Sequence, residues 1–225
     1  MDTKAYWIEL KEKFTNFYTG NKKIINGISI SLVVLIGGGT YWKMFYLPEQ
    51  EKKASEKFAK MYHYFKIDST SLVLNGSKTL KITSAPDIAD EYSSTKKGNE
   101  AALVAGISYL KTKKFELAKK YLNKVNSRDV VLNSSVISMK AVCESELGNA
   151  EKAAKLFEKA ALIGENDFSA MYLKKAGIHY ESENEFKNAL RCYETIKQKY
   201  SMTAEGSDID KYIYKMKAAL GEYNP

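Results

Sequence analysis

Residues 106–125 read GISYLKTKKFELAKKYLNKV, residues 141–160 read AVCESELGNAEKAAKLFEKA, and residues 177–196 read GIHYESENEFKNALRCYETI. The three blocks start at residues 106, 141 and 177, so they are 35 and then 36 residues apart. A period in this range is typical of stacked helix pairs, because each pair can bury its apolar face only against its neighbours. The sequence therefore predicts an all-α solenoid of helix pairs.

Residues of the same size recur at matching positions in the three blocks. Small residues stand in the first helix of each block, alanines in the second helix, and bulky residues four positions after those alanines: Gly106, Ala141, Gly177; Ala118, Ala153, Ala189; Leu122, Phe157, Tyr193. These are the small and aromatic positions of a tetratricopeptide repeat. The predicted first helices span Asn99–Lys111, Val130–Leu147 and Asp167–Ser182. Two departures stand out, because Glu144 replaces the ring found at Tyr109 and Tyr180, and the usual closing prolines are absent.

A long apolar stretch precedes the repeats. Residues 24–47 read IINGISISLVVLIGGGTYWKMFYL and contain no acidic residue and one base, Lys43. At a rise of about 1.5 Å per residue, a helix of this length reaches about 36 Å and can cross a hydrocarbon core of about 30 Å. A buried core helix and a cleaved signal peptide are the alternatives; no small-residue cleavage site follows the apolar run. The sequence predicts a single transmembrane helix over 24–47, and Gly37–Gly39 could permit close approach of a second helix.

The membrane boundary is predicted from charge and aromatic residues. Its members are Lys22, Lys23, Tyr41, Trp42, Phe45 and Tyr46. The Lys22–Lys23 pair favours a cytoplasmic N-terminus, although lysines on the two sides of the span are nearly balanced. Residues 1–23 form a predicted amphipathic tail, in which Thr3–Phe17 is a helix lying on the membrane or against a partner.

The rest of the chain flanks the repeats. Residues 48–98 are predicted to form membrane-proximal helices, among them Glu49–Phe65, with Pro48 in its first turn. Asp68-Ser69 offers a cap for a short helix, and Pro86-Asp87 opens another. Three repeats occupy 99–204. Residues 205–225 are predicted to contain a capping helix over Asp208–Leu220. It starts at a partial capping box of Ser207 and Asp210 and stops at Gly221. Its apolar face covers the open end of the solenoid and consists of Ile209, Tyr212, Ile213 and Met216.

Composition narrows the function classes. The formal charge of +8 comes mainly from lysine, with arginine only at Arg128 and Arg191. This suits anionic headgroups or acidic partners and disfavours nucleic acid, whose base readout relies on arginine.

Cys143 and Cys192 fall at helix positions expected to be buried, so we expect free core thiols. His63 and His179 have no acidic or cysteine neighbour at ligand spacing, and no phosphate loop, metal motif or nucleophile motif occurs. The sequence predicts no catalytic residue, no cofactor, no metal and no enzyme activity.

A protein-binding surface is the functional expectation. In stacked helix pairs the first helices line a concave groove that suits an extended or helical segment of another protein. By repeat position the groove would carry Leu103, Ile107, Leu110, Lys111, Ser138, Val142, Ser145, Glu146, Met171, Lys174, Ile178 and Glu181. The alternative is that the apolar members pack against the flanking helices.

The whole layout resembles a known family. The tail, the span, the membrane-proximal helix and the repeats, with Tyr92, Thr95, Gly98, Asn99 and Ala101 before the first block, are similar to the YfgM-type tetratricopeptide proteins in their Bacteroidetes form. The resemblance implies an inner-membrane protein with a cytoplasmic N-terminus and periplasmic repeats. It also implies an ancillary subunit of the Sec translocon that tethers a membrane-anchored, prolyl-isomerase-like periplasmic chaperone near the channel exit. A scaffold subunit of another envelope assembly, serving secretion, gliding or division, is the alternative.

Replacement of either recurring alanine by aspartate tests the repeat register. Ala118→Asp and Ala153→Asp would each bury an unpaired charge between two helices, and we expect each to destabilise the repeat domain by at least about 3 kcal/mol. Circular dichroism during thermal melting measures the effect. Full helicity and an unchanged melting temperature in both variants would show that the register is wrong.

Overall fold

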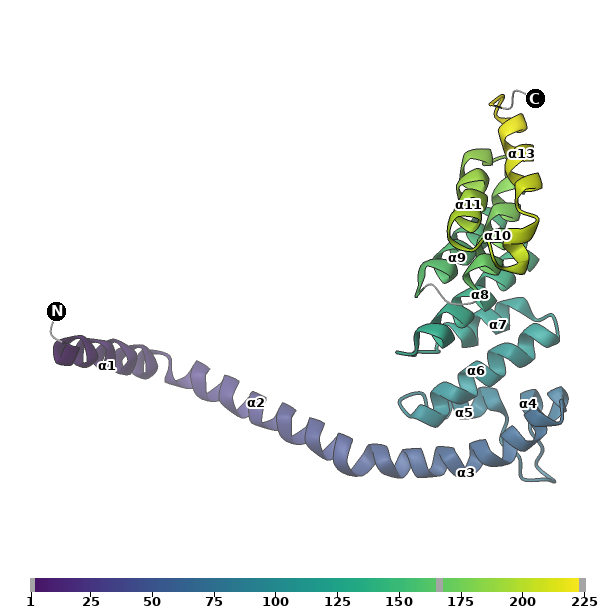
Figure 1. The fold of residues 1–225 in the computed structure, drawn as a ribbon. Coiled ribbons are helices and arrows are strands. Elements are labelled where there is room, and N and C mark those ends of the chain that lie inside the picture. The colour runs from purple at the N-terminus through teal and green to yellow at the C-terminus, as the bar shows by residue number, and fades with distance from the viewer. Residues whose placement is uncertain (1–2, 165–167, 223–225) are drawn as a thin grey trace. The chain divides into compact units, whose positions relative to one another are not determined.

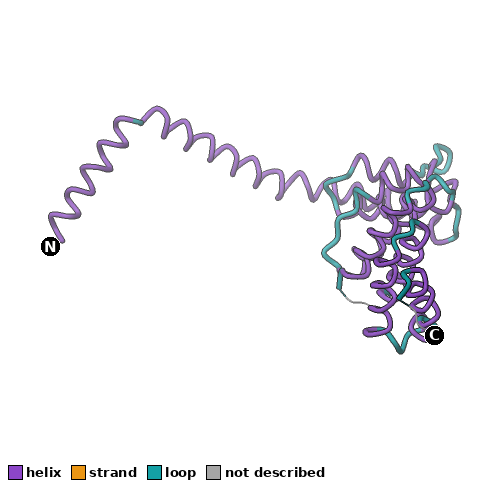
Figure 2. Tube along the Cα trace, turned by 90° about the horizontal axis from the view of Figure 1, so that it is seen from above, coloured by secondary structure: helices purple, strands orange, loops and turns teal. Residues whose placement is uncertain are grey.

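The computed structural model describes residues 3–164 and 168–222, and these residues form helices joined by short loops (Figures 1 and 2). Across these described ranges there is no strand, and one isolated β-bridge joins Ser77 to Ile82. The prediction of an all-α fold is confirmed. The chain divides into two compact units, Met1–Gln50 and Glu51–Pro225, each of which is described by itself.

The first unit contains the apolar helix. Helix α1 spans Thr3–Gly20, α2 spans Lys22–Tyr41, and the π-helix η1 spans Trp42–Tyr46. The backbone stays helical from Lys22 to Lys66, and the apolar window of this helix is long enough to cross a membrane, with 0% of it buried in the structure. It is therefore a candidate for a single membrane span. No atom lies within 4 Å of a Cβ built on any glycine of Gly37–Gly39, so a helix contact there stays a prediction.

The π-helix is explained by the proline that follows it. Helix α3 spans Leu47–Lys66, and Pro48 lies in its first turn, as predicted. Because proline lacks an N–H and its ring clashes with the carbonyl four residues earlier, a regular α-helix cannot continue unchanged through it. Here the Leu47 N–H bonds to the Trp42 carbonyl, five residues back. This wider turn lets the helix pass Pro48 without breaking.

The second unit is built of helices that pack on their neighbours in sequence (Figure 1). Two short helices, α4 over Thr70–Asn75 and α5 over Ala85–Glu91, follow α3. The repeats are the pairs α6 (Lys96–Lys111) with α7 (Phe115–Leu122), α8 (Val130–Glu146) with α9 (Ala150–Leu162), and α10 (Ser169–Ser182) with α11 (Phe186–Lys199). The chain ends with α12 (Ala204–Ser207) and α13 (Asp210–Ala219).

The predicted first helices agree with α6, α8 and α10. Helix α6 starts three residues before Asn99, because the Thr95 hydroxyl caps it by accepting from the Gly98 N–H at 2.9 Å. Helix α8 starts at Val130 as predicted and is capped by Asp129, which accepts from the Leu132 N–H. The predicted start of the third first helix, Asp167, lies outside the described residues.

Small residues permit the helix pairs to pack closely. A Cβ added to Gly106 would lie 2.7 Å from the Leu122 side chain, and one added to Gly177 would lie 2.4 Å from the Tyr193 ring. The three recurring alanines are fully buried, as are Leu122 and Tyr193. The predicted complementarity of small and bulky positions is therefore confirmed.

Helix α3 belongs to the core of the first repeat. Its residues Ala54, Phe58 and Met61 are buried in one cluster with Ile88 of α5 and Ala105 of α6. Glu51 adds a polar tie, since its carboxylate accepts from the backbone N–H groups of Lys96 at 2.7 Å and Lys97 at 3.2 Å. A carboxylate at a helix N-terminus is favourable, because the first N–H groups of a helix have no partner within it.

The C-terminal helix closes the solenoid. Ile209, Ile213 and Met216 are buried against the last repeat, and the Tyr212 ring lies 5.2 Å from the ring of Tyr193. This confirms the predicted cap. Gly221 has a φ of +72°, and the N–H of the next residue bonds to the Lys217 carbonyl, as expected for a helix stop.

Two predicted capping interactions are wrong. Ser207 is the last residue of the one-turn helix α12, and its hydroxyl donates to the Ala204 carbonyl, so it is not available to cap α13. Asp210 instead pairs with Lys197 at 2.7 Å. Ser69 stands at the start of α4 but makes no side-chain capping bond, and Asp68 pairs with Lys111 at 2.6 Å. The carboxylates of Asp210 and Asp68 form ion pairs with lysines of other helices instead of capping the helix beside them.

The Gly177 contact gives a test of the packing. Gly177→Val places branched carbon atoms where the Tyr193 ring already lies, so we expect a loss of at least about 2 kcal/mol of unfolding free energy. The double variant Gly177→Val with Tyr193→Leu should lose less than the sum of the two single variants, because the new space accepts the valine. Urea unfolding of the full chain in detergent micelles, followed by circular dichroism, measures all three. Additive losses would contradict a direct contact.

Candidate protein-binding groove

An open groove of about 590 Å³ lies between α3 and α6 in the second unit. Its lining is mostly apolar: Ser55, Phe58, Ala59, Tyr62 and Phe65 from α3, and Lys97, Glu100, Leu103, Val104 and Ile107 from α6. Helix α3 places its aromatic residues at positions i, i+4 and i+7, which share one face of a helix. The groove therefore lies between one row of side chains from α3 and one from α6.

The α3 side of the groove is a continuous aromatic strip formed by Phe58, Tyr62 and Phe65. The rings of Phe58 and Tyr62 stack at 5.2 Å between centroids, and those of Tyr62 and Phe65 at 5.7 Å. A lysine ammonium lies over each ring in turn, with Lys97 5.1 Å from Phe58, Lys66 5.4 Å from Tyr62 and Lys111 5.9 Å from Phe65. These contacts hold the lysine stems along the strip while their charges stay near water.

The groove combines an apolar floor with a cationic border. Leu103, Ile107, Tyr62 and Phe65 are only half-buried, so part of their apolar surface remains open to a ligand. Glu100 is the one carboxylate of the lining, and it is paired with Lys97 at 2.7 Å. Such a surface suits a helix or extended segment that brings apolar side chains with acidic neighbours. Within the described ranges, no group of three His, Cys, Asp or Glu side chains could hold a metal ion.

The groove contains two of the twelve residues predicted to contact a partner, Leu103 and Ile107. Three others, Ser145, Glu146 and Ile178, are at least partly open to solvent on α8 and α10. The twelve do not form one continuous lining in the structure. Contact of any of them with a partner remains a prediction.

The other seven predicted residues already have neighbours within the chain. Leu110, Val142 and Met171 pack against the apolar core, and the Ser138 hydroxyl donates to the Ser135 carbonyl. The charged members are Lys111, Lys174 and Glu181, which pair with Asp68, Asp208 and Lys215. The flanking helices therefore occupy much of the surface that isolated repeats would leave open.

Sequence reasoning missed the aromatic half of the groove. Phe58, Tyr62 and Phe65 lie in the membrane-proximal helix predicted over Glu49–Phe65, to which the sequence analysis assigned no binding surface. The signal that could have revealed them is the amount of aromatic surface on one face of α3, where only Ala54, Phe58 and Met61 become fully part of the buried core. Tyr62 and Phe65 touch the edge of that core and stay partly open to solvent.

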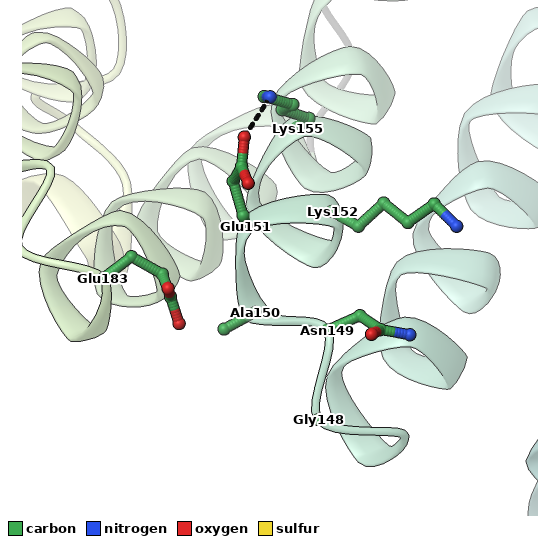
Figure 3. A pocket seen from close by; sticks show the side chains of 7 residues that line it. All are labelled: Gly148, Asn149, Ala150, Glu151, Lys152, Lys155 and Glu183. Atoms are coloured by element: carbon green, nitrogen blue, oxygen red, sulfur yellow. Dashed lines mark hydrogen bonds and ion pairs between the residues drawn. The ribbon is translucent and has the colours of Figure 1, made fainter.

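A second, polar cavity of about 400 Å³ lies at the α8–α9 turn (Figure 3). Its lining residues are Gly148, Asn149, Ala150, Glu151, Lys152, Lys155 and Glu183. Figure 3 shows Glu151 joined to Lys155, while Lys152 points away from Glu183. Because its charges are largely paired within the chain and its apolar surface is small, the cavity is a weaker candidate for a partner.

Beside this turn, Glu144 replaces the aromatic ring of the other repeats with an ion-pair network. Its carboxylate is buried, accepts from the Asn149 amide at 2.8 Å, and lies 3.4 Å from the ammonium groups of both Lys119 and Lys152. Burial by itself raises the pKa of Glu144, but the Asn149 hydrogen bond and the Lys119 charge outweigh it and hold the pKa below its ordinary value. Glu144 therefore joins α7, α8 and α9 by charge.

The two cysteines are buried free thiols, as predicted. Burial raises the pKa of Cys143 to about 11 and that of Cys192 to about 12. Since the thiolate is the reactive form, both side chains are inert packing residues at neutral pH. His63 is exposed on α3, and His179 stacks on the Phe157 ring at 5.6 Å.

The predicted membrane-boundary residues are exposed in the first unit. Lys22 and Lys23 begin α2, and the aromatic members stack in pairs, Tyr41 on Phe45 at 5.5 Å and Trp42 on Tyr46 at 6.5 Å. Two neighbouring ring pairs at one end of an apolar helix have the arrangement of an interfacial aromatic belt. Their position at a membrane surface remains a prediction.

Stacked helix pairs with an open apolar groove define a helical-repeat protein of the protein-binding class. The chain belongs to the tetratricopeptide repeat-like domain family, whose model matches residues 15–218. Comparison with curated proteins and with solved structures found no match. The family match includes the apolar helix α2 as well as the repeats, and repeat domains of this class typically act as non-catalytic adaptors.

The Glu144 network predicts a defined pH dependence. A carboxyl whose pKa is lowered in the folded state stabilises the fold above its unfolded pKa of about 4.5, and this contribution is lost as the pH falls through the folded value. Glu144→Gln cannot titrate, so between about pH 5 and pH 3 the variant should lose less stability than the natural protein. Urea unfolding at each pH measures the difference. Glu146→Gln, at an exposed position of the same helix, is the control and should follow the natural protein.

Proposed function

We propose that this protein is a membrane-anchored adaptor without enzyme activity. In this proposal α2 crosses the inner membrane once, the N-terminus lies in the cytoplasm, and the repeats lie in the periplasm. The apolar length of α2 and the aromatic pairs at its end support the span. The Lys22–Lys23 pair at the start of α2 supports the cytoplasmic N-terminus.

The groove between α3 and α6 carries the adaptor proposal. It offers the open apolar surface and the unfilled space that a protein-binding repeat domain requires, and the lysines along the aromatic strip favour an acidic segment. Binding there would bury the open parts of Tyr62, Phe65, Leu103 and Ile107. These four side chains supply the apolar anchors. Lys66, whose ammonium lies over the Tyr62 ring, supplies the charge that orients the bound segment, while Lys97 and Lys111 are paired with Glu100 and Asp68.

The proposed partners follow from the resemblance to YfgM-type proteins. The adaptor accompanies the Sec translocon and tethers a membrane-anchored, prolyl-isomerase-like periplasmic chaperone near the channel exit. Its work is to bring emerging secreted or envelope proteins to a chaperone before they aggregate. Tethering two membrane proteins in one plane raises their effective concentration, so a modest affinity in the groove is sufficient.

Affinity purification of the tagged natural protein in mild detergent, followed by mass spectrometry, tests the partners. We expect to recover the Sec channel together with a membrane-anchored prolyl-isomerase-like protein. Ile107→Glu should reduce chaperone recovery at least about tenfold, because it places a carboxylate in the apolar floor of the groove. Leu117→Glu, which changes an exposed leucine on α7 that does not line the groove, is the matched control and should leave recovery unchanged.

Other results would redirect the proposal in a defined way. Recovery of a different stoichiometric envelope complex, with neither the channel nor the chaperone, would favour the scaffold alternative. Equal loss of the partner from both glutamate variants would remove the groove as its binding site. Thermal melting of the three proteins separates loss of binding from loss of folding.

A further inference from the structure

We propose that α1 is a second membrane-binding element, which lies flat in the headgroup region of an anionic bilayer. Its contact is with lipid, and not with a partner protein. The inference rests on the proposed membrane span of α2, but it is independent of what occupies the groove in the repeat domain. Three observations in the first unit support it: the arrangement of the apolar residues, the positions of the lysines, and the connection to α2.

The apolar residues of α1 occupy one side of the helix. At 3.6 residues per turn, six of them fall within an arc of about 120°. The members of this apolar arc are Tyr6, Trp7, Leu10, Phe14, Phe17 and Tyr18. Their exposed fractions run from 37% for Tyr18 to 72% for Phe14, so the described part of the chain leaves the arc largely uncovered. Ile8 is the one large apolar residue of α1 outside the arc.

The charged residues are ordered around that arc. Lys13 lies at one edge, Lys4 and Lys11 lie at the other, and Glu9 and Glu12 lie on the opposite side. Lysines at the edges of an apolar face can extend their ammonium groups to lipid phosphates while their stems stay with the acyl chains. Glu12 would then point into water, while Glu9 forms an exposed ion pair with Lys13 at 2.8 Å, which is weak enough for a lipid phosphate to replace. This order selects a lipid surface with negative charge over a neutral one.

The connection to α2 fixes which side of α1 meets the bilayer. Asn21 is the one residue between the two helices, so the C-terminal end of α1 must lie within the interface if α2 spans the membrane. The chain turns at this point, as Figure 2 shows. The Tyr18 hydroxyl donates to the Asn26 side-chain oxygen at 3.3 Å, so the apolar arc borders the side of α1 on which α2 leaves. That side is the one facing the bilayer.

Tryptophan fluorescence of the full chain can test this placement. The sequence has two tryptophans, Trp7 in the arc and Trp42 at the far end of the span, so Trp42→Phe leaves Trp7 as the single reporter. The purified variant is reconstituted into vesicles of phosphatidylcholine with phosphatidylglycerol, with no other protein present. We expect bromines near the glycerol end of the acyl chains to quench Trp7 more than bromines near the terminal methyl. Iodide in the water should quench it several-fold less than free tryptophan.

Two further variants separate the apolar and the charged contributions. Phe14→Glu, made in the Trp42→Phe background, should return Trp7 to the water and restore iodide quenching. Glu12→Gln lies on the opposite side of α1 and should change nothing. Lys11→Glu with Lys13→Glu should remove the shielding of Trp7 by lipid. In vesicles of phosphatidylcholine alone, shielding of the natural lysine-bearing helix should be several-fold weaker.

The contrary outcomes are distinguishable. The inference would be overturned if iodide quenched Trp7 freely and brominated lipid did not. It would also be overturned if Trp7 were shielded from both quenchers, because a second copy of the chain would then cover the arc. Equal shielding in neutral and anionic vesicles would overturn the selection of anionic lipid. Alkaline extraction of the same vesicles reports whether α2 is inserted, because an inserted chain stays with the lipid. A chain that is extracted would refute the proposed span itself, whereas an inserted chain with exposed Trp7 would refute the role of α1 alone.

Discussion

The repeat domain depends on the close approach of the two helices in each pair, which one small side chain makes possible. At Gly106 and Gly177 there is no room for a Cβ, because Leu122 and Tyr193 occupy the space. This close approach leaves the alanines of the second helices fully buried, and each pair then stacks on the next. The middle repeat solves the same problem with Ala141 and Phe157, both buried in the largest core cluster.

Most of the fold could be predicted from the sequence, because periodicity and residue size act locally. The spacing of apolar residues indicated the helices, and the recurrence of small and bulky positions indicated how they pair. Helix ends were less predictable. Ser207 and Asp210 have the spacing of a capping box. In the structure, however, the Ser207 hydroxyl donates to the Ala204 carbonyl within α12, and Asp210 pairs with Lys197. Local patterns cannot reveal which competing partner lies nearer in space.

The candidate site was harder to predict, because it depends on which faces are covered by distant segments. Lys111 pairs with Asp68, 43 residues earlier, and Lys174 pairs with Asp208, 34 residues later. Neither pairing has a signature in the repeat register. The groove also depends on this coverage. Helix α3 packs on α6, and its aromatic side chains line the groove together with residues of α6. Leu103 and Ile107 were predictable from repeat position, whereas their neighbours on α3 required the tertiary structure.

The sequence-local packing of the second unit has a consequence for how the chain acquires its structure. Each helix pair contacts mainly the pair made just before it, and the last apolar face is closed by α13. Low contact order of this kind favours rapid, stepwise folding from the N-terminal side as the chain is synthesised. At every stage the newest pair has one bare face, and the final one stays bare until the last residues of α13 arrive. The risk of self-association therefore persists until α13 has been made and has covered the third repeat.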